Sequence, residues 1–597
     1  MKQYNFLIGL IIALALVLNS CHRDADSISG NIESIDDDDD IDNDDDEDED
    51  DSNLVLDDLG NMEGHEDEAD YTWDINDVNS IVLNGSTITV TGEGAEVNGS
   101  VVTIISAGTY DISGDLDNGQ VIVNTEDEST VRLILNSVDI TCSNNAALYV
   151  QKSEKTVIIL AEETTNYITD GSSYSSAEED ANAAVFSKSD LSIYGNGALV
   201  VNGKYNDGIT SKDGLIIGNG NITVNSVDDG IRGKDYLIIK GGDININSQG
   251  DGIKSDNENS LAKGYISIES GTVEIEAGGD GIQAQTDVLV FGGEINITTG
   301  GGSSASLGYD ESAKGIKSGV STLVYDGVLS INAADDGMHS NGFHKIYAGV
   351  FEIASGDDGI HSDYDLDIED GDIFITKSYE GLESSLGSIT LNGGNINVVS
   401  SDDGINVSAG GDSGFGGRKS TSVTESEYAL NINNEAYVYV NASGDGLDSN
   451  GNIYITGGTV LVNGPTSNGN GALDYDRTCE VSGGTLLAIG SSGMAQAPGS
   501  SSSQYSVKVN FRNTQSARTV FHIEDESGEG IFTYKSAKSF QSIVFSSPKL
   551  EKGVQYKLYT GGSSTGTETD GLYEGGNYTP GSVYTEFTIS NIVTSIY

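Results

Sequence analysis

Aspartate followed by glycine recurs at regular intervals through the middle of this sequence. Asp207, Asp229 and Asp251 each begin an Asp-Gly-Ile unit, and they are spaced 22 residues apart. The same spacing separates Asp336 and Asp358 further along the chain. If each period forms one turn of a solenoid, equivalent carboxylates stack about 4.8 Å apart. At an effective dielectric constant near 20 they repel each other by roughly 3 kcal/mol, so the ladder needs positive charge.

Calcium is the cation that fits such a ladder best. Ca²⁺ takes six to eight oxygen ligands at about 2.3–2.6 Å, so carboxylates in adjacent turns can share one ion. The glycine after each aspartate allows a positive φ, and we expect the backbone to turn sharply there. The predicted calcium ligands are the following repeat aspartates and their acidic neighbours: Asp228, Asp229, Asp251, Asp280, Asp335, Asp336, Asp357, Asp358, Asp402, Asp403, Asp445 and Asp448.

The alternative is that these aspartates only cap turns through their own backbone. This alternative gains weight at Asp251, which follows Gly250 where other units carry a second acid. It also gains weight at Asp207, which follows Asn206.

Basic residues and histidines follow the repeated unit closely. The basic residues are Lys212, Arg232, Lys254 and Lys317. We expect them to pair with the carboxylates, and the alternative is that one of them acts as a catalytic base. His339 and His361 each come three residues after a repeat aspartate, so they should stack on each other. They are interpreted as outward polar positions, with a metal or sugar contact as the alternative.

Short strands must position these residues. From about residue 76, stretches such as LIIGNGNITVNS and LIIKGGDININS alternate apolar and polar residues between glycine-containing bends, which is typical of short strands. A 22-residue unit with two or three strands and no helix predicts one turn of a parallel β-helix. Leucine-rich repeats would need a Leu/Asn consensus, and calcium-binding nonapeptide rolls would need a nine-residue period. We therefore predict an all-β fold, with a β-helix over 76–500 and a small β-rich cap domain over 501–597.

The N-terminus has the features of an export signal. Residues 6–18 form a mostly apolar run that is too short to span a bilayer, and Cys21 follows it. Residues 1–20 resemble a bacterial lipoprotein signal peptide, which implies lipidation of Cys21. The acidic composition of residues 21–75 predicts a disordered linker. We expect a lipid anchor to hold the protein at the bacterial cell envelope, on the outer membrane or cell surface.

Composition limits the classes of partner. The chain has 94 Asp and Glu against 28 Lys and Arg, a formal charge of −66. Nucleic acid is therefore excluded as an expected partner, because binding of phosphates depends on Lys and Arg. Cys142 and Cys479 lie near opposite ends of the presumed fold and are expected to be buried free thiols. We expect a monomer.

Three features together resemble one family. They are units such as DDGIHSD, the strand pattern L-x-I-x-x-G-x-I-x-I that follows such units, and the C-terminal YKLYTGG. With the lipoprotein start, they resemble the bacterial carbohydrate-binding β-helix proteins over roughly Trp73 to Tyr597. The resemblance implies a right-handed β-helix with bound calcium, and affinity for plant polysaccharides such as polygalacturonate or cellulose. The expected function is calcium-dependent polysaccharide binding without catalysis.

Two alternatives remain at this point. A calcium-dependent pectate lyase of the polysaccharide lyase 9 type has a similar fold, and Asp445 and Asp448 resemble part of its calcium cluster. Such an enzyme also needs an unpaired Lys as the base. The second alternative is an adhesin or structural spacer. Aromatic residues for sugar stacking are sparse, and most are interpreted as half-buried strand residues: Trp73, Tyr205, Tyr236, Tyr265, Tyr325 and Tyr364.

Overall fold

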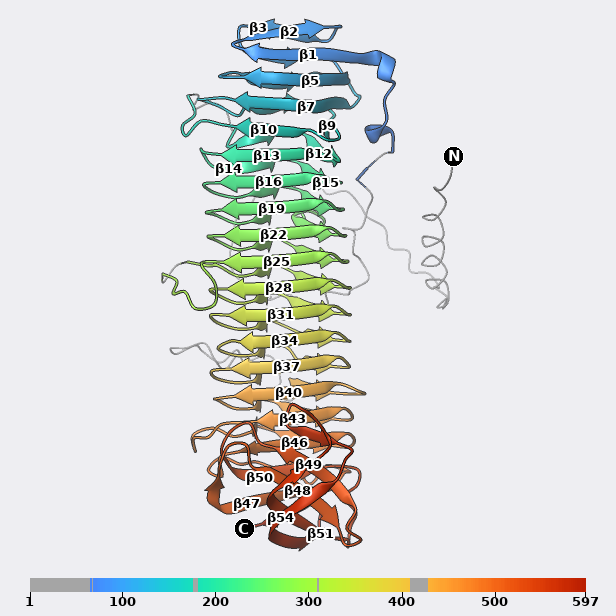
Figure 1. Ribbon diagram of the computed structural model, residues 1–597, viewed down its shortest axis with the longest axis vertical. Helices are drawn as coiled ribbons and strands as arrows, with labels where there is room; N and C mark the ends of the chain where they lie inside the picture. The colour runs from blue at the N-terminus through green and yellow to red at the C-terminus, as the bar shows by residue number, and fades with distance from the viewer. Residues whose placement is uncertain (1–64, 67, 176–180, 309–310, 409–427) are drawn as a thin grey trace, which may run out of the picture. The chain divides into compact units, whose positions relative to one another are not determined.

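Strands make up nearly all of the regular structure in this computed structural model, which describes residues 65–66, 68–175, 181–308, 311–408 and 428–597. The helical elements within those ranges are two 3₁₀ turns, η2 (Glu68–Tyr71) and η3 (Ile75–Asp77). No helix in the described ranges has the length and apolar character needed to cross a bilayer. In most turns the chain contributes one strand to each of three parallel stacks (Figure 1). The predicted parallel β-helix is confirmed.

After each Asp-Gly unit the chain enters stack 3, then stack 1 and then stack 2, and the stacks are given in that order here. Stack 3 contains β4 (Val101–Ile104), β6 (Gln120–Asn124), β8 (Leu148–Lys152), β11 (Ala183–Ser187), β14 (Asp207–Ser211), β17 (Ile231–Gly233), β20 (Ile253–Ser255), β23 (Ile282–Ala284), β26 (Ile316–Ser318), β29 (Met338–Ser340), β32 (Ile360–Ser362), β35 (Leu382–Ser384), β38 (Ile405–Val407), β41 (Leu447–Ser449) and β44 (Leu473–Tyr475). Stack 1 contains β9 (Lys155–Leu160), β12 (Asp190–Gly195), β15 (Gly214–Ile217), β18 (Tyr236–Ile239), β21 (Tyr265–Ile268), β24 (Asp287–Val290), β27 (Ser321–Val324), β30 (Phe343–Ile346), β33 (Leu366–Ile368), β36 (Ile389–Leu391), β39 (Ala429–Ile432), β42 (Asn452–Ile455) and β45 (Thr478–Val481). Stack 2 contains β1 (Val78–Gly85), β5 (Gly108–Leu116), β7 (Val131–Thr141), β10 (Thr165–Thr169), β13 (Ala198–Gly203), β16 (Asn221–Ser226), β19 (Asp243–Ser248), β22 (Thr272–Ala277), β25 (Glu294–Thr299), β28 (Val328–Ala333), β31 (Val350–Ser355), β34 (Asp372–Lys377), β37 (Asn395–Ser400), β40 (Tyr437–Ala442), β43 (Thr459–Asn463) and β46 (Thr485–Gly490).

The core consists of apolar side chains that repeat at the same position of each turn. Ile231, Ile253 and Ile282 pair in register at the start of their stack 3 strands, and each is fully buried. Stack 2 strands alternate, with Ile244 and Ile246 of β19 buried between exposed polar residues. Strand pairing and apolar burial therefore follow the same 22-residue period, which fixes the register because a one-residue slip would expose the buried face.

The glycine of the Asp-Gly unit has a different role from the predicted one. Gly230 and its equivalents are not among the residues with positive φ. A Cβ at Gly230 would lie 2.4 Å from the Ile246 side chain and 2.5 Å from the Gly252 carbonyl oxygen. Glycine is needed here because the turn passes close to its neighbours. Positive φ values occur instead at other glycines, including those in bends that join stack 1 to stack 2, for example Gly242.

Antiparallel strands cover both ends of the β-helix. At the N-terminal end, β2 (Thr87–Thr91) pairs with β1, and β3 (Ala95–Asn98) pairs with β4. At the C-terminal end, β50 (Phe540–Ser546) pairs with β46 and with β47 (Ser506–Gln515), which in turn pairs with β55 (Val593–Ile596). Open edges that could pair with another chain are covered in this way.

The remaining C-terminal strands form a separate six-stranded sheet. It consists of β48 (Val520–Asp525), β49 (Gly530–Lys535), β51 (Gln555–Ser564), β52 (Thr567–Thr569), β53 (Leu572–Glu574) and β54 (Tyr578–Thr588). Its aromatic core includes Phe521 and Tyr534 and continues into Leu461 and Leu487 of the last turns of stack 2. The Tyr534 hydroxyl accepts a 2.8 Å hydrogen bond from the Asn463 side chain. The C-terminal strands thus share a core with the β-helix.

A segment before β1, residues 65, 66 and 68–75, lies against stack 1, and we call it the strap. The sequence assigns these residues to the acidic linker, but they make specific contacts with distant turns. His65 stacks on Tyr236 with ring centroids 4.0 Å apart, and Lys155 Nζ lies 2.8 Å from Asp70 Oδ2. The rest of the predicted linker, the signal peptide and Cys21 lie outside the described residues. Cys142 and Cys479 are buried free thiols, as predicted.

Candidate functional site

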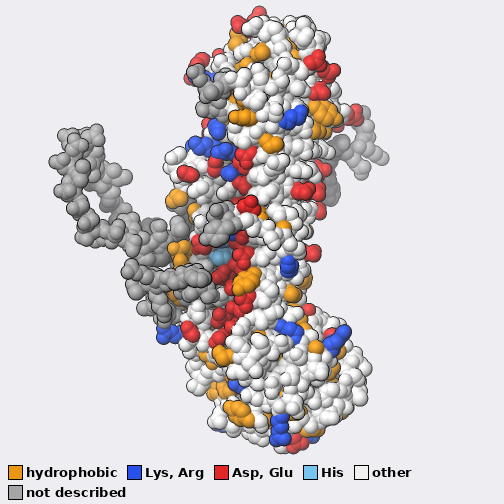
Figure 2. Space-filling view, turned by 90° about the vertical axis from the view of Figure 1, so that its left-hand side faces the viewer, with side chains coloured by type: hydrophobic (Ala, Val, Ile, Leu, Met, Phe, Trp, Pro, Cys, Tyr) orange, Lys and Arg blue, Asp and Glu red, His pale blue; other side chains and the backbone are white. Residues whose placement is uncertain are grey.

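The repeated Asp-Gly unit places two columns of polar side chains side by side along stack 3. The first column is called the ladder here. Each of its residues lies two positions before a buried apolar residue of stack 3, as Asp229 lies two positions before Ile231. Ladder positions hold Asp207, Asp229, Asp251, Asp280, Lys314, Asp336, Asp358, Glu380, Asp403 and Asp445. The second, the flanking column, is the middle residue of each three-residue strand. It holds Arg232, Lys254, Gln283, Lys317, His339, His361, Glu383, Asn406, Asp448 and Asp474, paired in register. Figure 2 shows acidic side chains gathered in a stripe along one face, with a histidine in its middle part.

Ladder carboxylates accept hydrogen bonds from the backbone of the next turn. Asp251 Oδ1 accepts the N–H of Asp280 at 2.8 Å, and Asp336 Oδ1 accepts the N–H of Asp358 at 3.1 Å. Glu380 N–H donates in the same way to Asp358 Oδ1 at 3.2 Å. Hydrogen bonds to a carboxylate stabilise its charged form. The turn-capping alternative therefore holds in a modified form at these positions, because Asp251, Asp336 and Asp358 cap the following turn rather than their own.

Basic side chains neutralise the first half of the ladder. Lys254 Nζ lies 2.7 Å from Asp251 Oδ2 and 3.3 Å from Asp229 Oδ2, so it bridges two turns. Lys317 Nζ lies 3.4 Å from Asp280 Oδ2. Arg232 pairs with Asp256 and lies 4.0 Å from Asp207. The predicted charge pairing is confirmed for these three bases, whereas Lys212 lies over the Phe186 ring, 5.8 Å from its centroid.

Lys314 occupies a ladder position itself, a role that the sequence analysis did not assign to it. Its Nζ lies 3.0 Å from Asp335 Oδ1 and 2.5 Å from Asp336 Oδ2. Burial alone would lower the pKa of Lys314, but the carboxylates of Asp336 and Asp335 raise it above its ordinary value. The pKa of Lys254 is raised in the same way by Asp251 and Asp229 against the effect of burial. A lyase base must give up its proton to act, so neither ammonium has the properties of that base.

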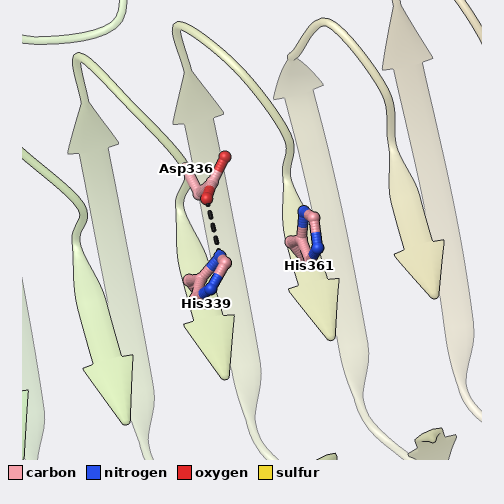
Figure 3. Close-up of side chains that lie close together, drawn as sticks. All are labelled: Asp336, His339 and His361. Carbon is pink, nitrogen blue, oxygen red and sulfur yellow. Dashed lines mark hydrogen bonds and ion pairs between the residues drawn. The ribbon is translucent and has the colours of Figure 1, made fainter. Parts of the chain in front are cut away.

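Two histidines continue the flanking column after the bases. His339 and His361 pair in register with ring centroids 4.7 Å apart, so they are adjacent in successive turns as predicted, although their ring planes are tilted by 37° (Figure 3). His339 Nδ1 lies 2.9 Å from Asp336 Oδ2, and His361 Nδ1 lies 3.0 Å from Asp358 Oδ2. Burial alone would lower the pKa of His361, but hydrogen bonds with Asp358, Asp363 and Glu383 raise it to about 12. Both rings therefore bind ladder carboxylates in addition to facing outward.

Acidic residues dominate the columns from Asp358 onward. Glu380 and Glu383 are 8% and 7% exposed, and the sequence analysis missed both, although the 22-residue register aligns Glu383 with His361. Burial raises the pKa of Glu380 to about 9, with further contributions from Glu383 and Asp358. Burial, together with Asp474 and Asp402, raises the pKa of Asp445 to about 6. Acidic side chains are thus concentrated toward the C-terminal end of the ladder.

The predicted calcium ligands fall into two groups in the structure. Asp229, Asp251 and Asp280 pair with lysines, and Asp228 lies beside Asp229 at the surface. The other group forms clusters in which one oxygen from each residue lies within 4.8 Å of the others. These clusters are Asp335, Asp336 and Asp357, and Asp403, Asp445 and Asp448. Asp402 precedes the second cluster, and Asp358 belongs to a cluster with His361 and Glu383.

Three aromatic side chains stack on one another away from the two columns. Phe291, Tyr325 and Tyr347 stack at the corner after stack 1, with centroids 4.8 and 4.9 Å apart and ring planes within 7°. Their faces contact one another, so mainly ring edges are free for a ligand. Tyr236 and Tyr265 are 8% and 1% exposed, which makes them buried rather than half-buried as predicted. Three other predicted aromatics are partly exposed: Trp73, Tyr205 and Tyr364.

The known proteins to which this chain is similar have carbohydrate-related descriptions. The family model of carbohydrate-binding domain-containing proteins matches residues 98–359 and 345–495. A protein of the same description from Acetivibrio thermocellus is 36% identical over 137 residues, which are 22% of this chain and 48% of the relative. The chain thus spans about half the length of that relative. A solved structure described as a polysaccharide lyase-like protein from C. thermocellum, in a gadolinium derivative, is 33% identical; the match covers 37% of this chain and 92% of that one, with a TM-score of 0.37.

Proposed function

The chain belongs to the family of carbohydrate-binding domain-containing proteins, and from this premise we propose that it binds an acidic polysaccharide through calcium without cleaving it. The proposed ligand is polygalacturonate, with cellulose as the neutral alternative. One observation carries the proposal: the ladder and the flanking column run in register along stack 3 and end in a region dominated by carboxylates. A regular column suits a regular polymer, because weak contacts in successive turns add through effective concentration.

Calcium is needed in this proposal because of charge. A protein with a formal charge of −66 repels a polyuronate, so direct ionic attraction cannot hold the two together. A Ca²⁺ ion whose coordination positions are only partly filled by the protein can bind uronate oxygens, and its charge makes the local electrostatic potential positive. The bound ion would therefore bridge the acidic protein and the acidic polysaccharide.

The calcium position that we propose is the cluster of Asp403, Asp445 and Asp448. Its side chains offer oxygens within 4.8 Å of one another and are only partly buried, so a bound ion could also reach a ligand. Gly444 leaves room for them, because a Cβ there would lie 2.2 Å from Asp403 Oδ1 and 2.4 Å from Asp402 Oδ1. In the first half of the ladder, lysines already occupy the space between carboxylates. We therefore place calcium in the second half.

The absence of catalysis is part of the proposal. β-Elimination by a calcium-dependent lyase needs a Lys that is neutral when it accepts the proton. Lys254 and Lys314 lie in ion pairs whose carboxylates raise their pKa values. This observation favours binding over cleavage at these columns.

A binding and cleavage assay on the full chain tests the proposal. We expect the protein to retain polygalacturonate in millimolar Ca²⁺, to release it in EGTA, and to produce no unsaturated uronate absorbance. The double variant Asp445→Asn/Asp448→Asn should bind at least about tenfold more weakly. A control variant, Asp243→Asn, changes an exposed acid on stack 2 and should bind as the wild type does. Equal binding in EGTA would refute the calcium bridge, and release of unsaturated oligouronides would establish a lyase.

We also propose that the mature protein is anchored by lipidation of Cys21, acts as a monomer and is held at the cell envelope, with the acidic linker as a spacer. The apolar run followed by Cys21 supports the anchor. Replacing Cys21 with Ala should release the protein into the soluble fraction. A variant that stayed in washed membranes would contradict this anchor.

A further inference from the structure

His361 lies between carboxylates on one side of its ring and polar groups on the other. Its Nδ1 atom is 3.0 Å from Asp358 Oδ2 and 2.9 Å from Glu383 Oε2. Its Nε2 atom is 3.1 Å from Ser385 Oγ and 3.5 Å from Asp363 Oδ1. The ring is thus fixed from both sides, and Figure 3 shows it beside His339 of the preceding turn.

This arrangement is the one expected of a histidine that binds a metal ion. Such a histidine binds the ion through one ring nitrogen and donates its other N–H to a carboxylate, carbonyl or water, which fixes the tautomer. Here Nε2 faces Ser385 and Asp363, so in the tautomer with its proton on Nε2 the Nδ1 lone pair is directed at two carboxylate oxygens. A proton or a metal ion must lie between these three atoms. A single proton on Nδ1 can point at only one oxygen at a time, whereas a metal ion is bound by all three atoms at once.

The spacing of the donor atoms also fits a small ion. Zinc binds nitrogen and carboxylate oxygen at about 2.0–2.2 Å, so two ligands of one ion lie roughly 3–3.5 Å apart. The distances from Nδ1 to the two oxygens, 3.0 and 2.9 Å, are close to that range. A nitrogen donor favours zinc and its neighbours over calcium and magnesium, which prefer oxygen alone.

Acidic side chains are gathered in a buried place beside His361. Asp358, Glu380 and Glu383 are 6%, 8% and 7% exposed, so water screens them poorly. The nearest base in the ladder, Lys314, bonds to Asp335 and Asp336 instead, and His339 bonds to Asp336. Among the described residues, His361 is the basic side chain that contacts both Asp358 and Glu383, whereas Glu380 accepts a hydrogen bond from the Asn406 side chain.

We propose that Asp358, His361 and Glu383 form a binding site for a divalent first-row transition-metal ion of the zinc class, distinct from the calcium position at Asp448. Water fills the remaining coordination positions. His339 and Asp336 lie one turn away, within 4.8 Å of His361 by their ligand atoms, and can supply a further ligand after a side-chain rotation. The ion ties two successive turns together, because its ligands come from both.

Cobalt is the probe that tests this site. The full chain is stripped with EDTA, returned to millimolar Ca²⁺ so that oxygen-only sites are filled, and titrated with Co²⁺. We expect one equivalent to bind with visible d–d absorption that Zn²⁺ abolishes in competition. The Glu383→Gln and His361→Gln variants should weaken binding at least about tenfold, while Asp448→Asn should leave it unchanged.

Two results would overturn the proposal. One is the absence of saturable Co²⁺ or Zn²⁺ binding in the presence of calcium, which would make His361 an imidazolium counter-ion only. The other is equal affinity in the wild type and in Glu383→Gln, a nearly isosteric variant whose fold is checked by its melting temperature. The polysaccharide proposal is tested separately, because it depends on Asp445 and Asp448.

Discussion

The backbone N–H of Asp251 donates a 3.0 Å hydrogen bond to the Asp229 carboxylate of the preceding turn. This bond shows how a column of acids is built into a stable solenoid. Most ladder carboxylates cap the turn that follows them, and a basic side chain compensates the charge of several of them, for example Lys254 at Asp251 and His339 at Asp336. Removing a base should therefore be costly, because it leaves buried charges unpaired.

Replacing Lys254 with Met should destabilise the β-helix strongly. The Lys254 ammonium pairs with Asp229 and Asp251, whose side chains are 7% and 13% exposed. Breaking a buried ion pair by removing one partner costs about 3–5 kcal/mol. The matched control is Lys152→Met, since Lys152 and its partner Glu126 are 55% and 83% exposed and such a pair contributes at most about 1 kcal/mol. Thermal melting of both variants measures the difference. Equal melting temperatures would contradict the conclusion that Lys254 compensates buried carboxylates of the ladder.

Stability should fall as pH rises through neutrality because of Asp207. Burial, followed by the nearby Asp229 charge, raises the pKa of Asp207 to about 7 in the folded protein. The ordinary pKa of about 3.9 applies in the unfolded chain. The stabilising effect of the bound proton is therefore complete below about pH 4 and is lost as pH rises through 7.

Asp207→Asn should flatten this part of the pH profile. The amide keeps an oxygen that can accept hydrogen bonds from Asn182 and Thr210, as the carboxylate does. Denaturant unfolding at pH 5, 6, 7 and 8 measures the free energy of unfolding for both proteins. The difference between the variant and the wild type should grow toward pH 8 by a few kcal/mol at most. A difference that is independent of pH would show that Asp207 is ionised throughout the range.

The periodic part of the site could be predicted from the sequence, and the rest could not. The 22-residue spacing places His339 beside His361 and sets Lys254 near Asp251, because strand register repeats with the sequence period. The strap contacts have no such basis: His65 Nε2 lies 2.7 Å from the hydroxyl of Tyr265, 200 residues away. The steric requirement for glycine could not be predicted from the sequence either, because a Cβ at Gly230 would clash with the side chain of Ile246, which belongs to another stack.

Calcium should raise the melting temperature through the Asp403, Asp445 and Asp448 cluster. An ion that binds only the folded state at 100 times its Kd adds about 2.7 kcal/mol to stability. We expect wild-type protein to melt higher in millimolar Ca²⁺ than in EGTA, and Asp448→Asn to lose most of this difference. Asp243→Asn, which alters an exposed acid on stack 2, should keep it. Coincident melting curves of wild-type protein with and without Ca²⁺ would rule out this site.

Asp70 should hold the strap against stack 1. Its side chain is 8% exposed and accepts hydrogen bonds of 2.8 Å from both Lys155 Nζ and Thr130 Oγ1. In Asp70→Ala, Lys155 loses its buried partner, so the strap should open while the β-helix stays folded. Limited proteolysis should then cut residues 65–75 faster than in the wild type.

The control for the strap is Asp74→Ala. Asp74 is exposed and bonds only locally, with its Oδ1 accepting from the backbone and side chain of Asn76. Opening should also uncover the Tyr236 and Tyr265 rings, which are now 8% and 1% exposed, so acrylamide should quench tyrosine fluorescence more strongly in Asp70→Ala. Asp74→Ala should behave as the wild type does in both measurements. If both variants were cut at the wild-type rate, the ring contacts of His65 and Tyr71 would be sufficient to hold the strap without the Asp70 ion pair.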